Sequence, residues 1–125
     1  MKILVCIISP TAHGGCEILT FSKSNGQYSL PYFESIKNPQ IESLEYSQKL
    51  LNIQNVELMT YLGCNQDVQA YILRTIRAQI EPARLSKLGC EFVPLNQDLF
   101  EKLEVQVTIF WKPLLDYVQE YMVWE

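Results

Sequence analysis

Three glutamates in the first half of the chain are the residues best suited to metal chemistry. Glu42 and Glu45 are three positions apart, so a helix would place them on one face, and Glu34 lies in a loop before them. Carboxylate oxygens are the ligands that Mg²⁺ prefers. Lys49 follows Glu45 by four positions, where an ordinary surface ion pair is expected and where an ammonium repels a cation. A solvated helix face is therefore the first interpretation, and a metal site the second.

The sulfur and imidazole groups favour neither zinc binding nor thiol catalysis. The four cysteines are widely spaced without a C-x-x-C pair, and the chain has one histidine, His13. His13 stands three residues before Cys16, but the Gly-Gly loop between them holds the pair poorly for nucleophilic catalysis. We expect free thiols in a reduced compartment.

Length and charge limit the class of protein. With 125 residues, 48% of them hydrophobic, one domain over residues 1–125 is expected. The net charge of −4 argues against nucleic-acid binding, and the basic cluster Arg74, Arg77, Arg84 and Lys87 is interpreted as a solvated strand edge and loop. No apolar run approaches the roughly 20 residues of a membrane span, and the run Ile3 to Ile8 is short for a signal core. A cytoplasmic protein without membrane contact is expected.

Hydrophobic patterning predicts a mixed sheet with helices on its faces, an α/β sandwich. Strands are expected over residues 3–8, 16–22, 28–31, 56–63, 68–80 and 90–95, and helices over 39–52, 97–103 and 111–122. Asn38 and Pro39 begin the first helix and Asn52 ends it, with a core stripe of Ile41, Leu44, Gln48 and Leu51. The last helix leaves Trp111 and Trp124 off its stripe, where they form either a partner or homodimer surface or a half-buried contact within the same domain.

The order of these elements, together with several phrases, resembles the Nudix family, hydrolases of nucleoside diphosphates linked to another group. The phrase EILTFSKSNGQYSLP resembles the family's hairpin before its functional box, and LLNI resembles the end of the box helix. GCEFVPLNQDLFEKL and PLLDYVQEYM resemble the later strand, short helix and closing helix. The resemblance covers nearly the whole chain and implies a Nudix-like α/β/α sandwich with a mixed sheet.

The resemblance also implies a degenerate box. The family pattern is Gly-x5-Glu-x7-Arg-Glu-U-x-Glu-Glu-x-Gly-U, where U is aliphatic and the glutamates bind Mg²⁺. When the pattern is aligned on Leu30-Pro31 and Asn52-Ile53, its first Gly falls on Phe33, and the loop after that position is two residues short. Its Arg-Glu falls on Glu45-Tyr46. Its Glu-Glu pair falls on Lys49-Leu50, and its central aliphatic residue on Ser47. Every carboxylate that the box helix should supply is therefore replaced.

Two functions follow from this resemblance. The preferred hypothesis is a module without pyrophosphohydrolase activity and without a metal cofactor, which binds a nucleotide-like ligand or a protein partner. Its candidate ligand-binding residues are Tyr32, Tyr46 and Arg74. The alternative is an active, divergent Nudix hydrolase that uses Mg²⁺ on Glu34, Glu42 or Glu45, with Asp67 or Asp98 in addition.

Overall fold

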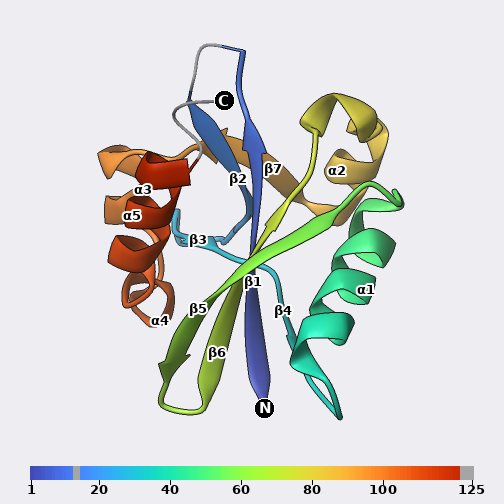
Figure 1. Ribbon diagram of the computed structural model, residues 1–125. Helices are drawn as coiled ribbons and strands as arrows, with labels where there is room; N and C mark the ends of the chain where they lie inside the picture. The colour runs from blue at the N-terminus through green and yellow to red at the C-terminus, as the bar shows by residue number, and fades with distance from the viewer. Residues whose placement is uncertain (13–14, 122–125) are drawn as a thin grey trace.

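The computed structural model describes residues 1–12 and 15–121. A seven-stranded mixed sheet lies between α1 (Pro39–Leu51) on one face and α3 (Gln97–Lys102), α4 (Val105–Thr108) and α5 (Trp111–Tyr121) on the other (Figure 1). This arrangement confirms the predicted α/β/α sandwich. His13, Met122 and Trp124, which entered the sequence predictions, lie outside the described residues.

Strand β1 (Lys2–Pro10) is the centre of the sheet. It runs parallel to β6 (Val68–Arg74), and on its other edge it pairs antiparallel with β2 (Cys16–Ser22) and β4 (Tyr32–Glu34). The remaining strands are β3 (Tyr28–Ser29) and β7 (Cys90–Pro94), which pair with β2, and β5 (Glu57–Asn65), which pairs with β6. The continuous apolar run of β1 is explained by this position, because both of its faces are covered.

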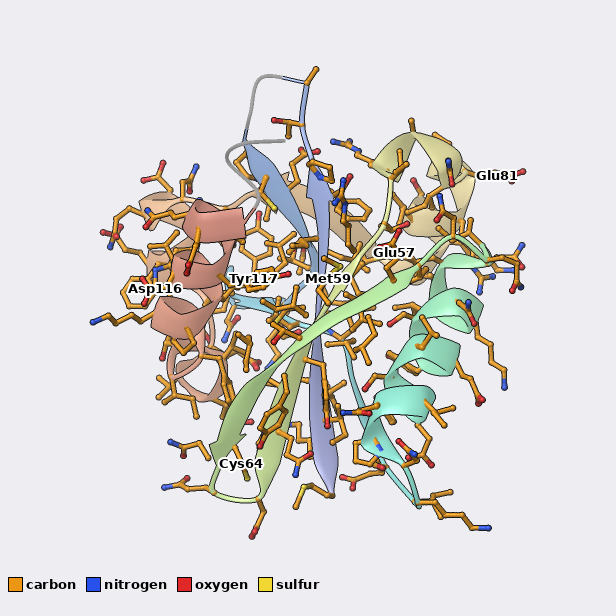
Figure 2. All side chains as sticks on the ribbon, viewed as in Figure 1. Glu57, Met59, Cys64, Glu81, Asp116 and Tyr117 are labelled. Carbon is orange, nitrogen blue, oxygen red and sulfur yellow. The ribbon has the colours of Figure 1, made fainter. Side chains whose placement is uncertain are left out.

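The side chains of β1 alternate between two apolar layers. Ile3, Val5 and Ile7 face α1, and Leu4, Cys6 and Ile8 face α5. Met59 of β5 and Tyr117 of α5 pack against the layer on the α5 side, where Figure 2 shows them facing the same interior. Of the two alternatives for Trp111, a partner surface or packing within the domain, the structure has the second: its ring is buried in this layer beside Phe100, with ring centroids 5.3 Å apart.

The predicted strand over residues 68–80 is wrong in its second half, because β6 ends at Arg74. Beyond that point the Arg77 N–H donates to the Ser9 hydroxyl at 3.0 Å, so a side chain takes the place of the backbone acceptor that a neighbouring strand would supply. The chain then turns into the 3₁₀ helix η1 (Arg77–Gln79). Pro82, expected to close the strand, occupies the first turn of α2 (Pro82–Leu88), a helix that the sequence analysis missed. Gly89, at φ 71°, ends α2 in the left-handed conformation.

Helix α1 has the predicted ends and part of the predicted buried face. Asn38 caps it, and Asn52 ends it in the left-handed conformation at φ 55°. Ser43, Ser47 and Leu51 are the fully buried residues, whereas Ile41 is 55% exposed. Each serine hydroxyl donates to the carbonyl four residues earlier, which satisfies it inside the core and lets the helix lie close to the sheet. The predicted apolar stripe is therefore confirmed at Leu44 and Leu51, which pack into the layer facing α1, and wrong at Ile41.

Glu42 holds the connection from β4 to α1. Its carboxylate accepts hydrogen bonds from the Ser35 hydroxyl and from the backbone N–H groups of Ile36 and Lys37, at 3.1 and 3.2 Å. The hydrogen bond from Ser35, followed by those from the backbone, lowers the pKa of Glu42 below its ordinary value. The carboxylate is therefore committed to the loop.

No helix among the described residues has the length and apolar character required to cross a bilayer.

We expect Glu42→Gln to destabilise the protein at pH 7 and to make no difference in strong acid. A lowered pKa in the folded state gives stability that is present above the unfolded pKa and lost as the pH falls through the folded pKa. The melting temperatures of the wild type and the variant should therefore converge as the pH is lowered below about 4.5. Glu45→Gln is the matched control, since Glu45 is an exposed glutamate of the same helix. A gap between Glu42→Gln and wild type that persists unchanged at pH 3 would contradict the assignment.

Candidate functional site

An aromatic pair occupies the place where the Nudix resemblance implies metal chemistry. Tyr46 of α1 stacks on Phe33 of β4, with ring centroids 5.0 Å apart and planes inclined by 24°. Both are half-buried and pack against the apolar layer that contains Ile3 and Val5. Such a stacked pair is stabilised by apolar burial and by ring geometry, and neither ring can ligate a hard cation.

The end of the same helix is closed by contacts with α2. Leu50 packs half-buried into the α1-side layer, while Lys49 is exposed. Arg84 of α2 donates to the backbone carbonyls of Leu50 and Lys49, each at 3.0 Å. These are carbonyls in the last turn of α1, which have no partner within the helix. The basic residue Arg84 is thus a helix clamp, and the solvated loop expected around it is incorrect.

The structure does not bring the three candidate glutamates together. Glu34 lies 3.3 Å from the amino nitrogen of Met1, Glu42 holds the β4 to α1 loop, and Glu45 is exposed. The expected ion pair between Glu45 and Lys49 is not formed. An exposed ion pair contributes little to the free energy of folding, so its absence costs little stability. Among the described residues, no group of three or more His, Cys, Asp or Glu side chains could hold a metal ion. The residues at the box positions therefore do not fit Mg²⁺.

The three candidate ligand-binding residues lie on different elements of the fold. Tyr32 pairs with Leu4 and so belongs to the α5 side of the sheet, where its ring is exposed and Lys2 Nζ lies 4.3 Å from its centroid. Tyr46 is on the α1 side. Arg74 pairs with Ile8, on the same side as Tyr32 but four positions further along β1, which is roughly 13 Å. Tyr32 and Arg74 are therefore separated along the sheet.

Burial raises the pKa of cysteine thiols and of a tyrosine hydroxyl. It raises the pKa of the Cys6 thiol to about 12 and that of the Cys16 thiol to about 11, and it is the largest cause in both. Burial also raises the pKa of Tyr46 above its ordinary value, with the neighbouring Tyr32 and Cys90 as smaller causes. All four cysteines are free, as expected, and the buried thiols Cys6 and Cys16 stay protonated at neutral pH.

One hollow of about 370 Å³ lies over the box helix and is lined by Glu45, Lys49 and Asn52 among others, and other cavities lie elsewhere. Beneath α3, α4 and α5, the apolar layer encloses a space of about 10 Å³, lined among others by Cys6, Leu30 and Trp111, too small for a ligand. A larger cavity of about 530 Å³ opens at the carboxyl end of β1, between the start of β2, η1 and α2. The sequence analysis missed it, because its polar residues Glu17 and Arg77 are far apart in the chain and form no local motif.

The sequence matches no family model and no curated protein, whereas the fold matches known structures closely. A mutT/nudix family protein from Listeria innocua superposes with a TM-score of 0.71 at 9% identity, over 99% of this chain and 96% of that one. The Nudix hydrolase RenU from M. smegmatis gives 0.68 at 12% identity, over 97% and 87%. The Ap4A hydrolase of C. elegans gives 0.66 at 8% identity, over 94% and 96%.

Other structures with this fold were determined in complexes. NrtR from Shewanella oneidensis was solved with a 27mer DNA, and its NUDIX domain with ADP ribose, at TM-scores of 0.56 and 0.58. The C-terminal domain of mouse MUTYH was solved in complex with human PCNA, at a TM-score of 0.57. Identities of 10 to 11% in these three comparisons carry the fold and nothing finer. The layer order, the strand pairing and these superpositions lead to one conclusion: the chain has the Nudix fold.

Proposed function

We propose that this chain is a non-hydrolytic Nudix-fold module that binds a nucleotide-like ligand or a protein partner. The observation that carries the proposal is the helix face of α1, on which Tyr46 and Leu50 pack into the core at positions where the family resemblance implies Mg²⁺-binding glutamates. Phosphoryl chemistry of that kind needs a cation to neutralise diphosphate oxygens and to activate water. A stacked aromatic pair supplies neither.

Two surfaces support binding rather than catalysis. The ring of Tyr32 is 55% exposed and already has a cation on one side, so a flat ligand or a partner's side chain can stack against it. Ile36 is 84% exposed in a loop that Glu42 holds in place. An exposed apolar side chain on a loop that is held in place can contact a protein partner. The MUTYH and NrtR complexes are consistent with the use of this fold in binding proteins and nucleotides.

The remaining parts of the proposal concern partners and location. No resident metal is included, a homodimer is an allowed assembly, and we place the protein in the cytoplasm. The exclusion of nucleic acid depends on the net charge of −4, and the NrtR complex with DNA shows that other chains containing this fold do bind it. The competing function is a divergent Mg²⁺-dependent hydrolase that uses Glu34, Glu42 or Glu45. The hydrolases with the same fold are consistent with this alternative.

The hydrolysis test compares the purified protein with and without Mg²⁺ and Mn²⁺ against nucleoside diphosphates linked to sugars, nucleosides and phosphate. We expect no turnover above the no-protein control in any combination. Glu45→Gln and Glu34→Gln serve as matched variants. Metal-dependent turnover that either variant abolishes would overturn the proposal and establish the divergent hydrolase.

We expect Tyr46→Ala to lower the free energy of unfolding by about 2 kcal/mol, because it removes the ring stacked on Phe33 and leaves a space in a half-buried layer. Tyr46→Phe retains the stack and should stay within about 0.5 kcal/mol of wild type. Urea unfolding followed by circular dichroism measures both. If Tyr46→Ala is as stable as wild type, the tyrosine is not part of the core and is available as a ligand contact instead.

A further inference from the structure

The cavity of about 530 Å³ at the carboxyl end of β1 is separate from the box positions. Phe33 pairs with Ile3, whereas the cavity begins at Ser9, six positions along the same strand, which is roughly 20 Å. Its volume lies in the range of sites that bind small molecules. Any role for it is therefore independent of whether hydrolysis has been lost.

Two charged side chains span the mouth of this cavity. Arg77 Nη1 donates to both carboxylate oxygens of Glu17, at 3.0 and 2.9 Å, and so connects η1 to β2. Glu17 and Arg77 are the only ionisable residues among the described residues that line the cavity. Figure 2 shows that Glu81, which begins α2, points away from the molecule. The part of the lining that the structure describes therefore carries no net charge.

A hydrogen-bond donor without an acceptor lies in the lining of the cavity. Ser9 is 2% exposed, and its hydroxyl oxygen accepts the Arg77 N–H at 3.0 Å. Within the described part of the chain, the hydroxyl of Ser9 donates to no acceptor. A buried hydroxyl normally uses its proton, so this one is available to an acceptor atom that enters the cavity. Around it the lining is mainly apolar, with Ile76 and Leu85 among its members.

From these features we infer a binding site for an uncharged, flat molecule that carries an amide or amino-heterocycle edge. Its carbonyl or ring nitrogen accepts from the Ser9 hydroxyl, and its N–H donates to the Glu17 carboxylate. The apolar lining covers its ring. An anion is disfavoured, because Glu17 already neutralises Arg77, and a cation is disfavoured in the same way by Arg77.

A matched series of three probes tests the assignment: benzamide is neutral, benzoate is an anion, and benzamidine is a cation. The ¹H–¹⁵N spectrum of the full chain is recorded at increasing probe concentration. We expect benzamide to move the backbone resonances of Thr11, Glu17, Arg77 and Ala78 saturably, and the two charged probes to bind at least about fivefold more weakly. Equal binding of all three probes, or no saturable shift at these residues with benzamide, would overturn the inference.

Two variants connect the binding to the named groups. Ser9→Ala removes the donor and should weaken benzamide about three- to tenfold. Ser9→Ala also leaves the Arg77 N–H without its acceptor. A second variant at the surface, Glu17→Gln, therefore tests the site without removing that acceptor. It frees the positive charge of Arg77, so the preference should shift from benzamide toward benzoate.

Lys87→Gln, on α2 but outside the cavity lining, is the matched control and should leave the order of the three probes unchanged. If Glu17→Gln leaves that order as in wild type, the ion pair does not set selectivity and the inference fails.

Discussion

The packing of β1 between two apolar layers is the constraint on which the rest of the structure depends. Its side chains from Ile3 to Ile8 are at most 3% exposed, and each such burial contributes about 1.5 to 3 kcal/mol relative to an exposed side chain. A strand covered on both faces needs one set of helices for its odd residues and another for its even residues. Helix α1 satisfies the first set, and α3, α4 and α5 satisfy the second.

The same constraint fixes the place of α1 in the fold. It covers Ile3, Val5 and Ile7, so it is required for stability whatever its outer positions do. Its fully buried residues are Leu51 and two serines that satisfy their own hydroxyls, and Tyr46 and Leu50 pack half-buried against the same layer. Replacing a carboxylate by an aromatic or aliphatic residue at such half-buried positions removes the cost of desolvating a charge and adds apolar contact. Stability and metal binding therefore place opposite demands on these positions.

The charged residues that remain are used as connectors. Glu42 fixes the β4 to α1 loop, Arg84 fixes the end of α1 to α2, and the Glu17 and Arg77 pair joins β2 to η1. In each case the charge is met by a backbone group or by its opposite.

The sequence by itself determined the fold class and the ends of α1, because both depend on local signals. The ends of α1 depend on the local preferences of Asn38, Pro39 and Asn52. The continuous apolar run of β1 predicts a central strand, because both of its faces must be covered. Pro82 carried a signal as good as that of Pro39, but the alternating pattern before it favoured a strand, and only the bond from Arg77 to Ser9 shows where β6 stops.

Tertiary structure alone decided which residues meet. Ser43 and Ser47, not Ile41, face the sheet, because the contact face of a helix is set by its neighbours as well as by its own periodicity. Tyr32 and Tyr46 occupy opposite sides of the sheet, since adjacent strand residues alternate and Phe33 takes the side of α1. The cavity at Ser9 depends on Glu17 and Arg77, whose approach follows from the pairing of β1 with both β2 and β6. No local pattern encodes such a meeting, because it is a property of the assembled sheet.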